Sequence, residues 1–587
     1  MNVPVIATAL CLWALPAAGE DALDNWFDQI TTQLESRSLT EIQSAKDWER
    51  HREKYRRQLS EMLGLTPLPN RNDLNTTVVG TLEHEEFTVE LLHFQPFPKL
   101  YVSANLYIPR QRKDKLPGIL YVCGHGSVIE EGQSYGNKTH YHKHGVWFAR
   151  NGYVCLIVDT VQWGEFSGKH HGTYRHKLWW WANRGYTPAG TEAWTGIRAI
   201  DLLQSRPEVD ADRIGVTGRS GGGAYTWWIA ALDERVKCAV PVAGITSMRN
   251  HIIDGCIEGH CDCMYMVNYY GWDFAQVAAL IAPRPLLISN TDKDPIFPLD
   301  GVIDVHKKTH RIYDLLGSEE RLGLHISEGG HVDTQEVRIN AFRWLNRWLK
   351  NDSDAITIPA EEIFERHQLR VFKQLPTDEI TTTIHEHLVP QSDIGMMQEF
   401  DKWGSTATRK LKPYIEQSGP PSPLFLDIRL FHKNSGTYSI IPLHDLDTIK
   451  ALPELTHVRR RHQLLGRSLN AEHAIALQRE ITRNSGTESI RITATGETGK
   501  TALIMAHFTP SIKEVVLEQL PASFAGPKPN DQEAVFLGIN RHLTLSQLVA
   551  LVARERIVRV RNSPDFNAIQ VKSALKAAGV PHQLFVD

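Results

Sequence analysis

One serine stands in a setting suited to nucleophilic chemistry. Ser220 lies in the run Gly218-Arg219-Ser220-Gly221-Gly222, after a β-prone stretch and before an apolar stretch with helical spacing. This order predicts a tight strand–turn–helix junction, where side chains at Gly218 and Gly222 would collide with the flanking strand and helix. The turn would hold Ser220 at a helix N-terminus, where backbone N–H groups and the helix dipole stabilise a developing oxyanion. The spacing therefore predicts a nucleophilic serine.

Short buried strands alternate with helices around this junction. The predicted strands are 118–122, 154–158, 214–216, 238–242, 285–288 and 324–326. Helices are predicted near residues 147–150 and at 193–203. Such alternation predicts an α/β fold with a mainly parallel sheet covered by helices on both faces. Ahead of it, residues 22–64 have the apolar stripe of a helix, and residues 76–109 alternate like antiparallel strands.

The region from residue 50 to residue 350 resembles the α/β-hydrolases, and within them the acetyl xylan esterase and dienelactone-hydrolase-like branch. The glycine-rich junction, an Asp-bearing strand end and a His-bearing loop follow one another in the family's order of serine, acid and histidine. The resemblance implies an α/β-hydrolase fold, a mainly parallel sheet flanked by helices. It also implies a serine activated by a histidine base that a carboxylate orients.

The resemblance assigns the base and the acid to two loops. His331 follows the last core strand and is the implied base. The acid should follow strand 286–288, where Asp292 and Asp294 both stand. The family commonly places its acid four residues before a proline, and Pro298 favours Asp294. Asp292 is then expected to cap the turn.

The resemblance also implies an oxyanion hole made of two backbone amides. One belongs to Gly221, directly after the serine. The other is expected near Gly126 or Ser127, in the loop that follows strand 118–122. His125 in the same loop is assigned to substrate binding.

Aromatic residues crowd the insertions of this region, and they include the run Trp179-Trp180-Trp181. Three consecutive tryptophans cannot all face inward from one helix or strand, so at least one is expected to line the cleft. Flat apolar faces there would stack on sugar rings. Trp163 and Trp180 are therefore assigned to substrate binding.

Length and composition place these elements in a chain of two or three domains. The chain has 587 residues and a net charge of −4, which argues against a nucleic-acid surface. Residues 1–19 are uncharged and end in small residues, so we expect a signal peptide and a secreted or periplasmic protein. No later run is long enough to span a bilayer.

Three further motifs are assigned no chemistry of their own. His140, His142 and His144 are interpreted as a basic helix start. The loop 256–263 carries Cys256, Cys261 and Cys263 and is interpreted as tied by a disulfide of open pairing. We expect no metal and no cofactor. The run 494–501 matches a relaxed phosphate-binding loop and is interpreted as part of an internal repeat.

Residues 375–587 are interpreted as a degenerate, truncated second hydrolase-like domain. Three pairs of segments match in the same order: 491–502 with 213–224, 512–513 with 236–237, and 547–553 with 276–282. Thr498 replaces the serine, and the sequence ends before a His-bearing loop, so this domain is expected to be inert. The expected divisions are 1–19 signal peptide, 20–95 helical and β-hairpin extension, 96–352 catalytic domain and 375–587 second domain.

These features favour a secreted serine esterase that deacetylates a polysaccharide such as acetylated xylan. A glucuronoyl or feruloyl esterase is one alternative, and a serine peptidase of the prolyl-oligopeptidase type is another. Such peptidases usually place a β-propeller ahead of the hydrolase, whereas residues 1–95 show no blade-length repeat. The intact Ser220, Asp294 and His331 disfavour a non-catalytic binding protein. The partner is expected to be a small-molecule or polysaccharide ester; acyl group, sugar and oligomeric state stay open.

Overall fold

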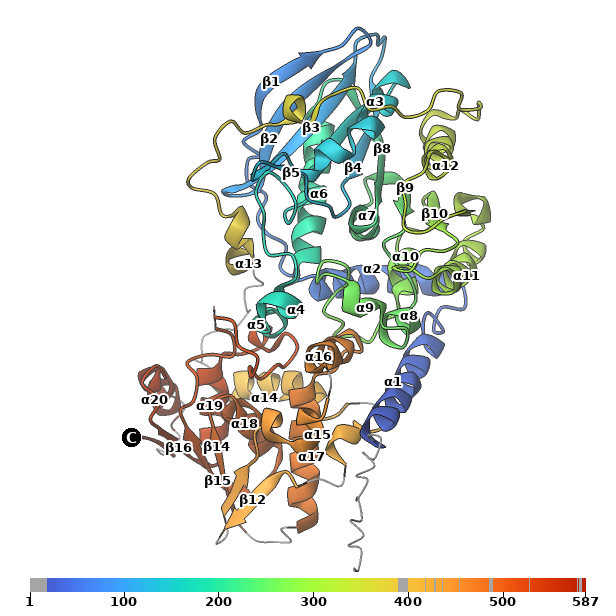
Figure 1. Ribbon diagram of the computed structural model, residues 1–587. Coiled ribbons are helices and arrows are strands. Elements are labelled where there is room, and N and C mark those ends of the chain that lie inside the picture. The colour runs from blue at the N-terminus through green and yellow to red at the C-terminus, as the bar shows by residue number, and fades with distance from the viewer. Residues whose placement is uncertain are drawn as a thin grey trace, which may run out of the picture.

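The computed structural model describes residues 18–388 and 400–587, apart from 418, 427–428, 435–436, 453, 485–488, 527, 578 and 580–582. Two large β-sheets divide the protein into two units, which lie one above the other in Figure 1. Residues 1–17 of the expected signal peptide lie outside the described residues. Within the described part of the chain, no helix is long and apolar enough to cross a membrane.

Two helices open the described chain, as residues 22–64 predict. α2 (Ala45–Met62) begins after Ser44, whose side chain accepts a hydrogen bond from the Asp47 amide, the usual cap of a helix N-terminus. It packs against the first unit. α1 (Ala18–Ser36) reaches along the second unit (Figure 1), where the Trp26 indole donates a 3.1 Å hydrogen bond to the Pro420 carbonyl. The N-terminal helices therefore connect both units.

The first unit is built on a nine-stranded sheet in the order β1-β2-β3-β7-β4-β8-β9-β10-β11. Its strands are β1 (Thr77–Glu83), β2 (Phe87–Phe97), β3 (Leu100–Pro109), β4 (Leu116–Val122), β7 (Val154–Val158), β8 (Val209–Arg219), β9 (Val236–Val242), β10 (Leu286–Thr291) and β11 (Leu322–Ser327). β1, β2, β3 and β7 pair antiparallel, whereas β7, β4 and β8 to β11 pair parallel. The chain runs from β4 to β7 on one side and returns to β8 on the other. A crevice beyond the carboxyl ends of such strands is where open α/β sheets bind ligands.

Helices cover both faces of this sheet, which confirms the predicted α/β fold. α3 (His142–Arg150) and α12 (Gln335–Leu345) lie on one face. The other face carries α6 (Pro188–Ser205), α7 (Gly221–Leu232), α10 (Phe274–Ala279) and α11 (Leu299–Leu315). Side chains of β4 alternate between the two cores: Ile119 and Tyr121 join one, and Leu120 and Val122 join the other. This alternation follows from the two-residue period of a strand.

The second unit has a six-stranded sheet in the order β12 to β17. Its strands are β12 (Phe431–Asn434), β13 (Thr437–Ile440), β14 (Ile490–Thr495), β15 (Ile512–Glu518), β16 (Ile557–Arg561) and β17 (Leu584–Val586), and β13 to β17 pair parallel. Its helices include α14 (Phe400–Leu411), α16 (Leu455–Leu464), α17 (Leu469–Asn484), α18 (Thr498–Phe508), α19 (Leu545–Ala553) and α20 (Ala568–Ala577). The succession β14-α18-β15-α19-β16 repeats β8-α7-β9-α10-β10 of the first unit.

The units meet where insertions of the first contact the second. Two short helices, α4 (Gly172–His176) and α5 (Trp180–Arg184), lie beside α16 at this junction (Figure 1). The Asn183 amide donates hydrogen bonds of 2.8 Å and 3.0 Å to the carbonyls of Phe524 and Ala534. Charged and buried polar groups thus join the units directly.

The expected division between residues 95 and 96 falls inside β2. Because β2 pairs along its length with β3, the hairpin assigned to an N-terminal extension forms one sheet with the expected catalytic domain.

Candidate active site

Ser220 lies at the junction between β8 and α7 with a strained backbone. Its dihedral angles are φ 61° and ψ −120°, a combination that costs free energy in an L-residue. A Cβ atom at Gly218 would lie 2.2 Å from the Val122 carbonyl oxygen, and one at Gly222 would lie 2.1 Å from it. Both positions therefore require glycine, for the steric reason that the sequence predicts.

The structure brings His331 and Asp294 to Ser220. His331 Nε2 is 2.9 Å from Ser220 Oγ, and His331 Nδ1 is 2.7 Å from Asp294 Oδ2. The three residues follow β8, β10 and β11, whose parallel carboxyl ends lie on one edge of the sheet. An imidazole so placed can take the hydroxyl proton at Nε2 while the carboxylate holds Nδ1–H.

Asp294 and Asp292 have different environments. Asp294 is buried and accepts hydrogen bonds from His331 and from the amides of Ile296 and Phe297, at 2.9 Å and 3.1 Å for the amides. Burial raises the pKa of Asp294, but these hydrogen bonds outweigh it and hold the pKa below its usual value. Asp292 is exposed and accepts a 2.8 Å bond from the Gly329 amide, so it supports the turn before His331.

The loop after β4 lies against the junction. A Cβ atom at Gly124 would be 2.5 Å from the Arg219 carbonyl oxygen. The buried Asn137 holds this loop, because its amide donates a 2.7 Å hydrogen bond to the Gly124 carbonyl. Gly126 follows and is exposed, whereas the amide of Gly221 belongs to the first turn of α7 and has no acceptor within that helix. The loop and the helix start thus lie on either side of Ser220.

His125 covers the start of α7. A Cβ atom at Gly221 would be 2.4 Å from His125 Nε2. The same nitrogen is 2.7 Å from the Tyr225 hydroxyl, and Cys261 and Cys263 form a disulfide beside the ring. The expectation of a local disulfide is met, and Cys256 stays a free thiol. Burial lowers the pKa of His125 well below its usual value, so the imidazole is neutral.

The three consecutive tryptophans are buried. Trp179, Trp180 and Trp181 are 1%, 0% and 1% exposed. They pack against the second unit: Trp181 and Trp180 cluster with Ala525, and the Arg459 guanidinium lies 3.9 Å from the Trp179 ring centroid. The assignment of Trp180 to substrate binding is therefore corrected, because a second domain covers the outward face of α5.

Trp163 remains half-buried beside the cluster around His125. Its ring contacts His170 edge-on, with centroids 4.8 Å apart, and His170 contacts His125 with centroids 4.7 Å apart. His142 and His144, in contrast, bond to separate partners, the Thr139 carbonyl and Asp333.

The second unit makes a contact near the site that the sequence does not predict. The fully buried Arg460 of α16 donates to the His260 carbonyl. His260 stacks on Phe297 with ring centroids 5.1 Å apart, and Phe297 lies 5.8 Å from His331. Its only sequence signal is the run of three arginines at 459–461.

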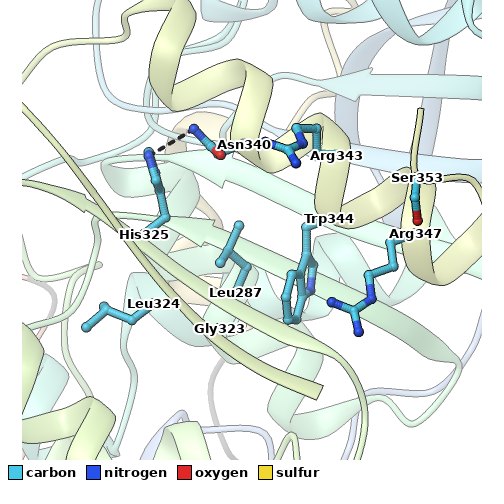
Figure 2. Close-up of a pocket in the computed structure, with 9 residues that line it drawn as sticks. All are labelled: Leu287, Gly323, Leu324, His325, Asn340, Arg343, Trp344, Arg347 and Ser353. Carbon is cyan, nitrogen blue, oxygen red and sulfur yellow. Dashed lines mark hydrogen bonds between the residues drawn. The ribbon is translucent and has the colours of Figure 1, made fainter. Parts of the chain in front are cut away.

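The cavity of about 510 Å³ in Figure 2 lies elsewhere. It is bounded by β10, β11 and α12, and its walls include His325, Asn340 and Trp344. Ser220, Asp294 and His331 are absent from these walls, so the cavity is separate from the site at the carboxyl end of β8.

Sequence comparisons find a family model and a bacterial protein that are similar to part of the chain. Residues 100–280 match the model of a family described as X-Pro dipeptidyl-peptidase (S15 family). The chain is 27% identical over 299 residues to YtaP of Bacillus subtilis, whose name describes a hydrolase; the match covers 50% of this chain and 98% of that protein.

Two solved structures are similar to part of the chain at low identity. The methylesterase BT1017 is 21% identical with a TM-score of 0.45, over 66% of this chain and 80% of that chain. A glucuronoyl esterase from Solibacter usitatus is 17% identical with a TM-score of 0.43, over 53% of this chain and 96% of that chain. Nothing about the substrate follows from these likenesses.

Proposed function

We propose, on the premise that the chain is an α/β-hydrolase of the esterase or S15-peptidase type, that it is a serine carboxylic-ester hydrolase. Its proposed reaction is the removal of acetyl groups from a polysaccharide such as acetylated xylan. The observation that carries the proposal is the pair of hydrogen bonds linking Asp294, His331 and Ser220, at 2.7 Å and 2.9 Å, on a strained backbone. The spacing is that of a nucleophile, a base and an orienting carboxylate.

The proposed reaction begins at Ser220. Its Oγ attacks the ester carbonyl carbon while His331 Nε2 takes the hydroxyl proton. The carbonyl oxygen becomes an oxyanion, which the amides of Gly221 and Gly126 stabilise. When the intermediate collapses, the bond to the sugar oxygen breaks and His331 gives its proton to that oxygen. An acetyl group then remains on Ser220.

Water completes the cycle by the same steps. His331 takes a proton from the water that attacks the acetyl carbonyl, and Ser220 regains its proton as acetate leaves. Asp294 stays ionised throughout, since hydrogen bonds outweigh burial and keep its pKa low. Its carboxylate holds His331 in the tautomer that leaves Nε2 free and stabilises the imidazolium.

The S15 family match favours a second candidate, a serine peptidase that cleaves after an X-Pro dipeptide. Such a reaction would use the same three residues. His125 contacts His170, Tyr225 and the 261–263 disulfide. None of these is a carboxylate that could bind the N-terminal ammonium group of a peptide, so they suit a neutral ester.

A substrate panel separates the two candidates. Initial rates are measured on acetylated xylan, p-nitrophenyl acetate, a glucuronoyl ester and an X-Pro p-nitroanilide, with Ser220→Ala as the blank. Acetate release from xylan that disappears in Ser220→Ala is the expected result. Cleavage of the anilide without acetate release would assign the site to the peptidase.

We further propose a secreted or periplasmic location and a positioning role for the second unit. The Cys261–Cys263 disulfide supports the location, since disulfides persist in oxidising compartments. Arg460 supports the role, because it fixes the His260 carbonyl in the loop that packs toward His331.

A further inference from the structure

Four potential metal ligands from three segments converge beside the proposed active site. They are His125 in the loop after β4, His170 in the loop before α4, and Cys261 and Cys263 after the short helix α9 (Cys256–Gly259). One ligand atom from each lies within 4.8 Å of the others. None of the four belongs to the hydrogen-bonded set Asp294, His331 and Ser220.

Distances within the cluster are close to those of a coordination sphere. His125 Nδ1, the nitrogen that could bind the ion, is 3.6 Å from Cys261 Sγ. Ligands that bind zinc at about 2.0–2.3 Å in a tetrahedron lie roughly 3.3–3.8 Å apart. Once the disulfide is reduced and its two sulfurs separate, the four side chains are close enough to surround one ion.

His170 offers a buried ring nitrogen to a cation. His170 Nδ1 is buried without a hydrogen-bond partner among the described residues. A buried nitrogen with a free lone pair gains much from a metal, because it has otherwise lost its hydrogen bond to water.

Outer contacts set the tautomer of His125. The Tyr225 hydroxyl donates a 3.1 Å hydrogen bond to Gln162 Oε1, so its oxygen is left to accept from His125 Nε2–H at 2.7 Å. Nδ1 then keeps its lone pair and faces Cys261. Partners of this kind orient histidine ligands in known metal sites.

We propose that His125, His170, Cys261 and Cys263 form a redox-gated site for zinc-like divalent cations. In the oxidised chain each sulfur is bonded to the other and offers no thiolate. A dithiol reductant supplies two electrons and two protons: the S–S bond breaks, two thiols form, and the reductant becomes a cyclic disulfide. The cation then displaces two thiol protons to solvent and forms two metal–sulfur and two metal–nitrogen bonds.

The inference goes beyond the proposed function and does not rest on it, because metal binding is measured without turnover. Its location still has a consequence for the site. Since the His125 ring covers Gly221, a bound cation brings positive charge next to an amide that we propose binds the oxyanion.

Cobalt absorption tests the site in the full-length protein. Protein treated with a dithiol and then freed of it is titrated with Co²⁺, which absorbs strongly in the near ultraviolet when thiolates bind it. We expect one Co²⁺ per chain, displacement by Zn²⁺, and no such absorption in untreated protein. A reduced protein that shows no thiolate–cobalt band overturns the proposal.

Substitutions test which residues bind the cation. We expect Cys261→Ser/Cys263→Ser to lose the band, and His170→Ala to weaken Co²⁺ binding at least 10-fold. Tyr225→Phe, which loses only an outer contact, should weaken it about 10-fold. Cys256→Ser is the matched control, since this free thiol begins α9, shortly before Cys261, and lies outside the cluster. Thermal melting confirms that each variant folds.

Two outcomes contradict the assignment. The band persists in the folded Cys261→Ser/Cys263→Ser protein, or it disappears in Cys256→Ser. Either result would place the thiolate ligands elsewhere.

Discussion

The two units share an order of strands and helices but differ at one turn. In the first unit the strand-to-helix junction gives Ser220 a φ of 61° and a ψ of −120°. At the matching junction of the second unit, Gly496 has a φ of 57° and Glu497 is already helical, at φ −59° and ψ −29°. Because glycine adopts positive φ without cost, the second turn carries no strained side chain.

The two junctions also differ in the side chain that follows the turn. Lys500 of the second unit stands where Gly222 stands in the first, and its ammonium lies 2.7 Å from Glu497 Oε2 and 3.3 Å from the Phe524 carbonyl oxygen. The lysine of the run that resembles a phosphate-binding loop is therefore used in a buried ion pair.

A shared order of strands and helices is therefore not sufficient for the reaction that we propose at Ser220. Strain at the serine distinguishes the first junction, together with the close approach of Gly218 and Gly222 to the Val122 carbonyl, which leaves no room for a side chain at either glycine. Thr498 begins α18 at a junction without that strain. A different helix of the second unit, α16, contacts the loop near His331 through Arg460.

The largest effect should follow removal of the Ser220 hydroxyl. Ser220→Ala should lower kcat for ester hydrolysis by about 10⁵- to 10⁶-fold, because no other group forms the acyl intermediate. Thr498→Ala, its counterpart in the second unit, should leave kcat unchanged. Steady-state kinetics on p-nitrophenyl acetate measure both, and turnover that depends on Thr498 would reverse the comparison.

The acid provides the next test. Asp294→Asn should lower kcat about 10⁴-fold, since an amide favours the wrong tautomer of His331. Asp292→Asn is the matched control in the same loop and should cost far less, because the Asp292 carboxylate bonds to the turn at Gly329 and pairs with Lys293 rather than with His331. A larger loss in Asp292→Asn would exchange their roles.

Glycine substitutions compare the two junctions by stability. Gly222→Ala should reduce the free energy of unfolding by about 3 kcal/mol, because its Cβ would meet backbone atoms that cannot move aside. Gly499→Ala should change it by less than about 1 kcal/mol, since its Cβ meets Leu520 Cδ1, the end of a flexible side chain, at 2.8 Å. Urea unfolding followed by fluorescence measures both, and equal losses would contradict the contrast.

The smallest expected effect is a loss of folding stability at low pH, to which His473 of the second unit contributes. Burial lowers the pKa of His473 to about 3. The unfolded chain therefore binds more protons between pH 6.5 and about 3, so stability is present above pH 6.5 and falls as pH drops through this window. From pH 6.5 to 5, His473 alone should lower the free energy of unfolding by about 1–2 kcal/mol.

His473→Gln should reduce this pH dependence while the catalytic groups stay intact. Unfolding measured at pH 7.5 and pH 5 in both proteins provides the comparison. An identical loss in His473→Gln would show that other groups carry the acid sensitivity.

Local sequence determined the elements and the shape of the first junction. Strand and helix periods in residues 118–326 predict the helix-covered sheet, and Gly218 and Gly222 predict the turn, because backbone sterics act within a few residues. The order of Ser220, Asp294 and His331 followed from resemblance. Parallel strands then bring their carboxyl ends to one edge, where the structure has the three residues within hydrogen-bonding distance.

Only the tertiary structure decided which surfaces are covered and which distant groups meet. Trp180 is buried because the second unit packs on α5, through contacts such as Asn183 to Phe524 that span 341 positions. The pairing of Cys261 with Cys263, and the approach of His125 and His170 to them, likewise join three loops. Periodicity and spacing report the local backbone, whereas burial and side-chain convergence arise when separate segments pack together.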